Sequence, residues 1–381
     1  MTGLRSEKGY MDKITILKTV NNLSNNAMFA LSLTSRELFH SNFWAWIIRK
    51  YPQVFTKVFY PDYNGIDDVE VLREKYNFDL LLKINDEYII IESKFKSMPN
   101  KEQLENYFEK LYVDKKKIVL ISYFNTLFLS KLPNLEYISY TELYSRLKSA
   151  FDNAATDIFE ENDKWLIQNY TELINLLNQT QDNITWNEES KIGDLWALIK
   201  DEEIQKALSI VNFGKTFERI FITKLTQEVL KDFDYVDFID KISIDCGQDL
   251  KVFSDIMFYF PGAWDEDESK RKDLCYLGIS LWGIEYRYCA GLHKAKCGIF
   301  APKNGKSDTE NKIAGFKYLS ENYSWFFNQE NMCKWNGYSY EKEMYLYKKL
   351  DISNLTVKEL SEKALKDLSL IYFYLKPMRE I

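Results

Sequence analysis

The spacing of apolar and polar residues predicts an α/β domain over the first 150 residues. A capping box, Thr34 with Glu37, precedes an apolar run that ends at Pro52, so we expect a first helix to begin at Thr34. Three strand-like runs follow, IDDVEVLREKY, FDLLLKI and EYIIIESK. After them come a helical pattern, two more strands and a helix: NKEQLENYFEKLYV, KKIVLISYF, LEYISY and TELYSRLKSAF. The order α-β-β-β-α-β-β-α predicts a mixed sheet with helices on its faces.

The pattern changes near residue 160. Long helical stretches lead into strands such as LKVFSDIMFYF and LCYLGISLW, and VKELSEKALKDLSLIYFYLK predicts a final helix. The polar stretch between Phe151 and Asp163 is the best place for a domain boundary. We therefore expect one domain over residues 1–155 and a C-terminal α+β domain over residues 156–381, whose topology the pattern does not specify.

Charged residues interrupt the most apolar hairpin, FDLLLKINDEYIIIESK at residues 78–94. Charges in strands buried on both faces are costly unless they are paired or hold a metal. If Asn85 and Asp86 form the turn, Asp79 lies opposite Glu92, where two like charges repel each other. Lys94 follows Glu92 by two positions and shares its face. A divalent cation between the two carboxylates would explain this placement.

The chemistry of these groups suits phosphodiester hydrolysis. Hard oxygen ligands favour Mg²⁺ or Mn²⁺, and the carbonyl of Ser93 would add a further oxygen. Phosphodiester hydrolysis uses such a cation to activate water and to neutralise charge on the phosphate. Lys94 would position the water, help deprotonate it or stabilise the transition state.

Each feature also has a simpler structural explanation. Glu92 and Lys94 could form an ordinary ion pair on an exposed strand. Glu37 could serve only as the reciprocal cap of Thr34, and His40, three residues later, could pair with it. Gln103 and Tyr107, four residues apart on the next predicted helix, could lie on a solvated face. The order in which all these residues occur favours a site.

That order resembles the PD-(D/E)XK nuclease superfamily. ELFHSNFWAWIIR is similar to its first-helix motif, Phe78-Asp79 stands where the family usually has Pro-Asp, and Glu92-Ser93-Lys94 matches E-x-K. QLENY, from Gln103 to Tyr107, matches the QxxxY signature of the RecB and lambda-exonuclease branch. The resemblance covers residues 34–148 and implies an αβββαβ restriction-endonuclease-like core.

The resemblance also implies roles for individual residues. Asp79 and Glu92 would bind the metal, with Ser93 contributing its carbonyl, and Lys94 would be catalytic. In this branch a Glu or His on the first helix helps to hold the metal, which leaves Glu37 and His40 as alternatives. Gln103 and Tyr107 would contact the phosphate backbone or the outer shell of the metal. The product would carry a 5′-phosphate.

Composition limits the environment and the partners. The chain has 381 residues, 46% of them hydrophobic and 28% charged, with no apolar run of membrane-spanning length and no secretory signal at its N-terminus. Its five cysteines form no CxxC pair, so we expect a cytoplasmic protein without membrane contact. The net charge of −7 disfavours nucleic acid, but residues 1–150 carry 21 basic against 18 acidic residues. A nucleic-acid partner therefore remains open.

The sequence favours a Mg²⁺- or Mn²⁺-dependent nuclease that cuts DNA in bacterial defence, repair or a mobile element. RNA as substrate and a homodimer are left open, and the second half would provide substrate choice, dimerisation or partner binding. Aromatic residues and lysines alternate over residues 310–348, which we expect to form a packed aromatic core rather than a base-stacking surface. The alternative function is a catalytically silent nucleic-acid-binding or protein-interaction protein that keeps the nuclease fold.

Overall fold

The chain divides into two compact units. The first comprises Met1–Thr185 and Leu198–Ile220, and the second comprises Trp186–Ala197 and Phe221–Ile381. The computed structural model describes residues 11–32, 36–66, 68–95, 99, 101–124, 129, 132–155, 157–233, 242–246, 254–260, 275–293, 321, 324–327, 336–339 and 343–375. Within these ranges no helix is both long and apolar enough to span a bilayer.

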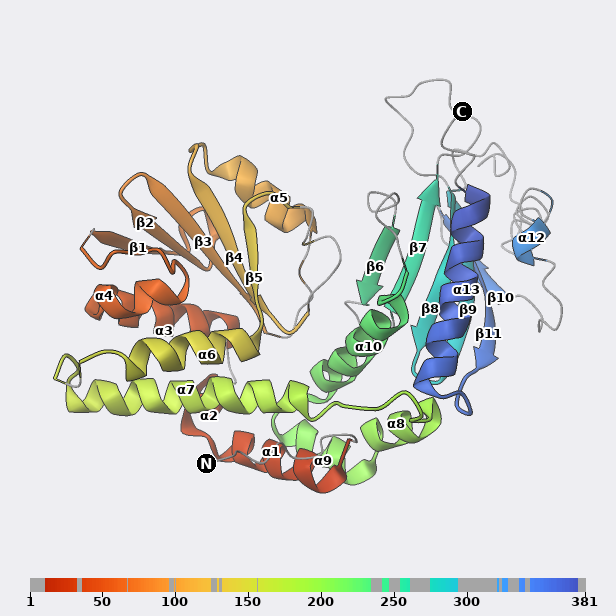
Figure 1. The fold of residues 1–381 in the computed structure, drawn as a ribbon, viewed down its shortest axis with the longest axis horizontal. Helices are drawn as coiled ribbons and strands as arrows, with labels where there is room; N and C mark the ends of the chain where they lie inside the picture. The colour runs from red at the N-terminus through yellow and green to blue at the C-terminus, as the bar shows by residue number, and fades with distance from the viewer. Residues whose placement is uncertain are drawn as a thin grey trace. The chain divides into compact units, whose positions relative to one another are not determined.

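A mixed sheet forms the centre of the first unit (Figure 1). In the described residues it contains five strands in sequential order: β1 (Val69–Arg73), β2 (Leu80–Ile84), β3 (Glu87–Lys94), β4 (Lys116–Ser122) and β5 (Leu135–Ile138). The first three strands pair antiparallel, whereas β4 lies parallel to both β3 and β5. The predicted mixed α/β sheet is confirmed, and each strand falls within the run that predicted it.

The β2–β3 hairpin has the register that its short turn predicts. Leu80 pairs with Ile91 and Ile84 with Glu87, which leaves two residues for the turn. The first of them, Asn85, has a φ of 53°, in the left-handed region that asparagine tolerates better than most residues. Continued by one position, this register places Asp79 opposite Glu92.

Further helices lie wholly within the first unit. They are α1 (Lys13–Asn25), α2 (Ala27–Ser32), α3 (Arg36–Lys50), α4 (Pro52–Phe55), α5 (Lys101–Lys110), α6 (Tyr140–Asp152), α7 (Glu161–Asp182) and α9 (Glu202–Ile210), with short 3-10 turns η1 (Thr56–Val58) and η2 (Lys75–Asn77). Two further helices, α8 (Ile192–Ile199) and α10 (Gly214–Leu230), each cross from one unit to the other along the chain.

The helix expected between Thr34 and Pro52 corresponds to α3, but it is not the first helix, because α1 and α2 precede it; Thr34 itself lies outside the described residues. The missed signal is Asp12, whose side chain accepts hydrogen bonds from the backbone N–H groups of Ile14 and Thr15 and so caps α1.

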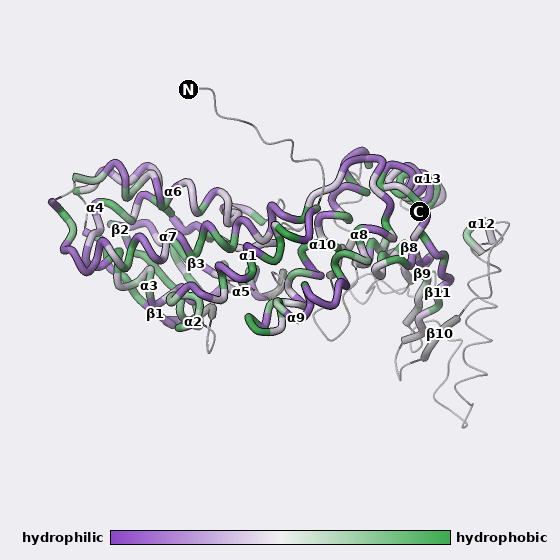
Figure 2. The backbone as a smooth tube through the Cα atoms, turned by 90° about the horizontal axis from the view of Figure 1, so that it is seen from below, coloured by the Kyte–Doolittle hydropathy of each residue, from purple (hydrophilic) through white to green (hydrophobic). Residues whose placement is uncertain are grey.

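Different helices pack on the two faces of the first sheet. Helix α5 packs on one face through an apolar cluster that contains Phe78, Leu81, Ile90, Leu104, Tyr107, Ile118 and Leu120. On the other face Phe95 and Tyr123 contact Tyr140 of α6, and Tyr123 donates to the carbonyl of Leu177 in α7. Hydrophilic and hydrophobic segments alternate along α6 and α7 in Figure 2, as expected for amphipathic helices.

A second sheet forms the centre of the second unit. Its strands in the described residues are β6 (Ile242–Cys246), β7 (Ser254–Phe260), β8 (Cys275–Trp282), β9 (Glu285–His293), β10 (Asn336–Ser339) and β11 (Glu343–Asp351). They pair antiparallel in the order β10-β11-β9-β8-β7-β6, and the helices of this part are α12 (Ser324–Phe327) and α13 (Val357–Leu375).

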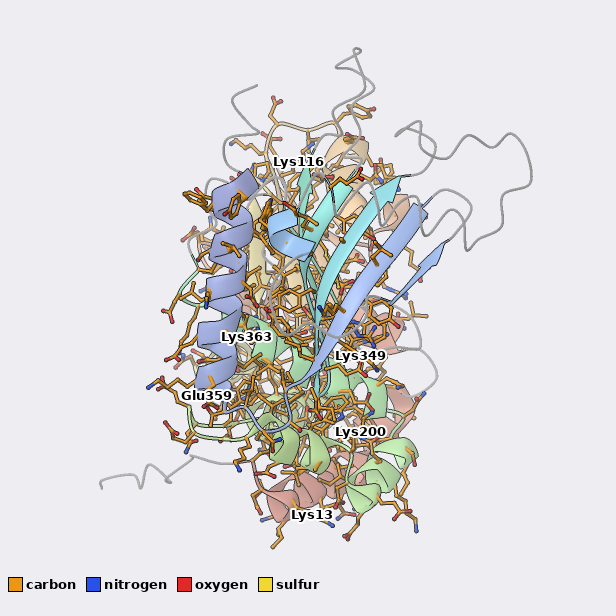
Figure 3. All side chains as sticks on the ribbon, turned by 90° about the vertical axis from the view of Figure 1, so that its right-hand side faces the viewer. Lys13, Lys116, Lys200, Lys349, Glu359 and Lys363 are labelled. Carbon is orange, nitrogen blue, oxygen red and sulfur yellow. The ribbon has the colours of Figure 1, made fainter. Side chains whose placement is uncertain are left out.

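Helix α13 is fixed to one face of the second sheet by a buried carboxylate. Tyr286 and Tyr288 of β9 donate to Oδ2 of Asp367 at 2.7 and 2.8 Å, and Lys363 lies 3.2 Å from the same oxygen. Arg287 lies between these tyrosines on β9 and is the cross-strand neighbour of Lys349 in β11. The side chains of Arg287 and Lys349 therefore lie on the opposite face of the sheet. Figure 3 shows Lys363 and Lys349 on the two sides of the sheet.

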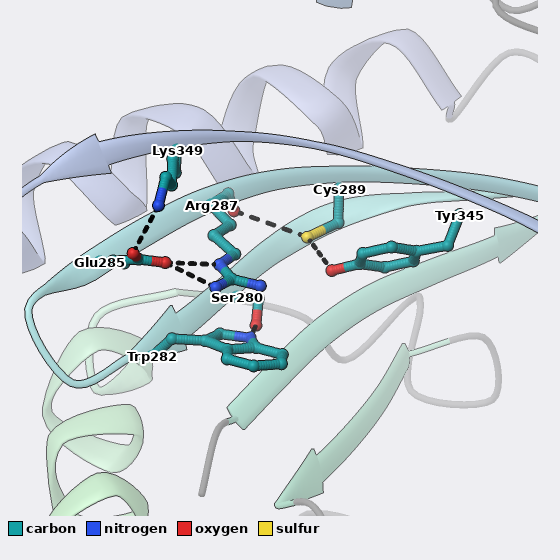
Figure 4. A network of polar contacts seen from close by, with 7 residues as sticks. All are labelled: Ser280, Trp282, Glu285, Arg287, Cys289, Tyr345 and Lys349. Carbon is teal, nitrogen blue, oxygen red and sulfur yellow. Dashed lines mark hydrogen bonds and ion pairs between the residues drawn. The ribbon is translucent and has the colours of Figure 1, made fainter. Parts of the chain in front are cut away.

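The opposite face carries a connected polar and aromatic network (Figure 4). The guanidinium of Arg287 lies 3.7 Å from the ring centre of Trp282 and 4.7 Å from that of Tyr347. Glu285 binds both Arg287 and Lys349, and Tyr345 Oη lies 2.8 Å from Cys289 Sγ. The aromatic residues of β11, which belong to the aromatic stretch noted in the sequence, are therefore packed onto the sheet.

Candidate active site

Five of the candidate side chains come together on the face that α5 covers. Asp79 lies immediately before β2, Glu92 and Lys94 lie near the end of β3, and Gln103 and Tyr107 lie one turn apart on α5. Direct contacts join Glu92 to Lys94 and to Gln103, and Gln103 to Tyr107. We call these five residues the Glu92 group.

Glu92 is the centre of this group. Its side chain is almost fully buried, with 1% of the residue's surface exposed. Lys94 Nζ lies 2.7 Å from Oε1, and Gln103 Nε2 donates to the same oxygen at 3.1 Å. The other oxygen, Oε2, is buried and has no hydrogen-bond partner among the described residues. A buried carboxylate oxygen of this kind is costly, so it marks a position where a cation or a water would bind.

The surroundings of Glu92 favour its protonated form when no cation is bound. Burial, followed by the nearby charge of Asp79, raises the pKa of Glu92 from its ordinary value of 4.5 to about 7. Lys94 opposes both effects through its charge and its hydrogen bond, and the nearby Tyr107 hydroxyl acts in the same direction as Lys94. A divalent cation between the carboxylates would lower the pKa of Glu92, because it favours the ionised form of both groups.

Asp79 is held in place by the backbone of the neighbouring strand. The N–H of Ser93 donates to Oδ2 of Asp79 at 2.9 Å. Asp79 is half-buried, and its charge is close enough to Glu92 to affect the pKa of that carboxyl. Two like charges are thus kept side by side by the register of the hairpin, which supports a site built around a positive partner.

Gln103 and Tyr107 fix the orientation of Glu92. Gln103 Nε2 donates to Tyr107 Oη at 2.5 Å as well as to Glu92, and Tyr107 Oη donates to the carbonyl of Asn77 at 3.2 Å. Burial, followed by the charge of Glu92, raises the pKa of Tyr107, so its hydroxyl stays protonated near neutral pH. The pair therefore connects α5 both to Glu92 and to the loop before Asp79.

The loop that leads to Asp79 has a strained backbone. Glu74, Tyr76 and Asn77 have φ angles of 54°, 60° and 65°, in the left-handed region. This conformation costs about 1 kcal/mol or more at each residue other than glycine, and such residues concentrate at functional sites. The sequence gives no signal of this loop, because no glycine marks the left-handed positions in EKYN.

Of the two first-helix candidates, the structure describes the side chain of His40 alone. His40 of α3 is buried, its Nδ1 lies 2.7 Å from Tyr170 Oη, and its ring centre lies 5.7 Å from that of Phe95. These contacts belong to the face of the sheet opposite α5. Glu37 lies on α3, but its side chain falls outside the described part of the chain.

The residues of the Glu92 group fit a hard divalent cation. Two carboxylates and the backbone carbonyl of Ser93 are the oxygen donors that Mg²⁺ and Mn²⁺ prefer, and the unpartnered Oε2 of Glu92 supplies a donor that nothing else in the described chain uses. The described residues contain no cluster of three or more His, Cys, Asp or Glu side chains suited to a metal. Among the described side chains, the Glu92 group offers a cation the carboxylates of Asp79 and Glu92, beside the backbone carbonyl of Ser93.

Comparison with known proteins gives no relative from which a function could be carried over. No protein-family model, no curated protein and no solved structure matches the chain.

Proposed function

We propose that the chain is a metal-dependent nuclease with a restriction-endonuclease-like core, which hydrolyses phosphodiester bonds in DNA. One observation carries the proposal: the buried carboxylate of Glu92 has an oxygen without a hydrogen-bond partner among the described residues, beside the like charge of Asp79. Such an arrangement is unfavourable for the protein alone and becomes favourable when a cation is bound.

The fold of the first unit supports this proposal. Helix α3 precedes three antiparallel strands, α5 follows them, and β4 then pairs parallel to β3. This is the αβββαβ order expected from the sequence motifs. The motif residues Asp79, Glu92 and Lys94 lie at the same end of the β2–β3 hairpin, away from its turn.

The side chains of the group have distinct roles in this proposal. Asp79 and Glu92 would hold Mg²⁺ or Mn²⁺, which when bound supplies Lewis-acid activation of water and neutralises charge on the phosphate. Gln103 keeps Glu92 oriented through its hydrogen bond to Oε1. Lys94 donates to the same oxygen and can move its ammonium group to the phosphate as negative charge develops there.

The test is cleavage of plasmid DNA, linear single-stranded DNA and RNA in EDTA, Mg²⁺ or Mn²⁺. We expect metal-dependent cutting of DNA by the wild type, with a loss of about 100-fold or more in Asp79→Ala and Lys94→Ala. Lys83→Ala is the matched control, since this half-buried lysine lies on β2 near the turn of the same hairpin. It should cut at the wild-type rate.

Two results would contradict the proposal. Equal cleavage by wild type, Asp79→Ala and Lys94→Ala would remove the Glu92 group from the chemistry. Absence of cleavage under every condition, together with salt-sensitive retention of DNA, would favour the catalytically silent nucleic-acid-binding protein.

A further inference from the structure

An exposed aromatic side chain stands beside the Glu92 group. Tyr76 lies in the strained loop before Asp79, with φ 60° and ψ 20°, and 49% of its surface is exposed. Asparagine or glycine would fit this left-handed backbone with less strain. An exposed ring also contributes little to the core, so the fold of the loop gives no strong reason for a tyrosine at this position.

The ring of Tyr76 is the outer end of an aromatic series that leads into the site. Its centre lies 5.8 Å from that of Phe78, and Phe78 lies 4.8 Å from Tyr107. Phe78 directly precedes Asp79 in the chain, and the hydroxyl of Tyr107 accepts a hydrogen bond from Gln103. A base stacked on Tyr76 would therefore be next to the residues that would act on the adjoining phosphate.

Cationic groups flank this series. Lys75 Nζ lies 5.5 Å from the ring centre of Tyr76, and Lys110 Nζ lies 5.9 Å from that of Tyr107. Both lysines are exposed. An aromatic platform bordered by lysines matches the two parts of a nucleotide, since the base stacks on the ring and the phosphate pairs with the ammonium group.

We infer that Tyr76 stacks on an unpaired base of the substrate, and that the site acts on single-stranded or frayed DNA in preference to intact duplex. This inference rests on the proposed nuclease function. A base inside a duplex has neighbours on both of its faces and cannot stack on a protein ring unless it leaves the helix. Substrate choice would then lie partly in the first unit, in the loop that positions Asp79.

The alternative explanation is that Tyr76 only shields Phe78 from water, and three substitutions separate the two roles. Tyr76→Phe and Tyr76→Trp keep a stacking ring, whereas Tyr76→Leu keeps apolar cover over Phe78 but cannot stack. Tyr112→Leu is the matched control, because Tyr112 lies just beyond the end of α5 and is 94% exposed. Circular dichroism and thermal unfolding verify that each full-length variant is folded.

The first measurement compares kcat/KM for a single-stranded oligonucleotide and its duplex in Mg²⁺. We expect the single-strand preference to fall about tenfold in Tyr76→Leu, the size of one base–aromatic stack, and to persist in Tyr76→Phe, Tyr76→Trp and Tyr112→Leu. An unchanged preference in Tyr76→Leu would overturn the inference.

The second measurement does not depend on cleavage. A single strand that contains 2-aminopurine is titrated with each variant in EDTA, and stacking on a ring quenches its fluorescence. We expect quenching by the wild type, Tyr76→Phe and Tyr76→Trp, and its loss in Tyr76→Leu. Equal quenching by Tyr76→Leu would refute stacking even if the enzyme cuts DNA. Absence of cleavage with Tyr76-dependent quenching would refute the nuclease function and leave the stacking role in place.

Discussion

The backbone N–H of Ser93 donates to the carboxylate of Asp79 at 2.9 Å, fourteen positions away in the chain. This bond fixes Asp79 against the strand that carries Glu92, so that two acids which repel each other remain adjacent. The repulsion between the two carboxylates can be measured as a change in the pKa of Glu92 when the charge of Asp79 is removed.

Asp79→Asn should lower the pKa of Glu92. The charge of Asp79 is the second cause of the elevated value of about 7, after burial. Because burial remains in the variant, we expect the pKa to stay above the ordinary 4.5 but to fall below that of the wild type. The measurement is the carboxyl ¹³C shift of Glu92 against pH in metal-free buffer, assigned with Glu92→Gln. A pKa that does not move would show that Asp79 and Glu92 are not coupled.

Glu92→Gln should stabilise the metal-free protein at high pH. A carboxyl whose folded pKa lies above its unfolded pKa binds the proton more tightly when folded. Stability therefore falls as the pH rises from 4.5 to about 7, and the loss is complete above that range. The amide avoids this cost, which amounts to about 3 kcal/mol for a shift of this size. Urea unfolding in EDTA should show the difference at pH 8 and almost none at pH 4.5. A variant no more stable than the wild type at pH 8 would contradict the assignment.

Tyr107→Phe should weaken both the fold and the site. The hydroxyl accepts from Gln103 and donates to the carbonyl of Asn77, and the side chain is buried. Its loss should cost about 1–2 kcal/mol in the free energy of unfolding and should lower any metal-dependent cleavage, since Gln103 loses one of its anchors. Chemical denaturation measures the first effect. The matched control is Tyr112→Phe at a highly exposed position, and an equal effect there would show that the Tyr107 hydroxyl has no special role.

Asp367→Ala should destabilise the second unit. Its carboxylate accepts hydrogen bonds from Tyr286 and Tyr288, whose hydroxyls are buried, so truncation leaves two donors without their partner. We expect a loss of about 2–4 kcal/mol, measured by urea unfolding of the full chain. Glu362→Ala on the exposed side of the same helix should have almost no effect. Wild-type stability of Asp367→Ala would mean that this carboxylate does not hold α13 on the sheet.

The sequence predicted the hairpin best, because local rules determine it. A two-residue turn at Asn85-Asp86 fixes which residues pair, and the alternation of side chains then places Glu92 and Lys94 on one face. The spacing of Gln103 and Tyr107 likewise placed both on one side of α5. The contact of Gln103 with Glu92 depends on how α5 packs on the sheet, which local spacing does not specify.

Other features depended on long-range contacts or on atypical residues. The second sheet pairs β9 with β11 across 50 to 66 positions, so its strand order could not be read from separate strand-like runs. The left-handed loop before Asp79 uses Glu74, Tyr76 and Asn77 in place of glycine, and it is visible only in the backbone angles. The contact of His40 with Tyr170 joins α3 to α7 over 130 positions.

The register of the β2–β3 hairpin also determines which changes of length the protein can tolerate. One residue added to or removed from β3 between Tyr88 and Glu92 would turn Glu92 and Lys94 to the face that holds Phe95 and His40. All the residues of the Glu92 group would still be present in the sequence, yet the carboxylates would lie on opposite sides of the sheet. The candidate site is therefore more sensitive to a single insertion in this strand than to many substitutions around it.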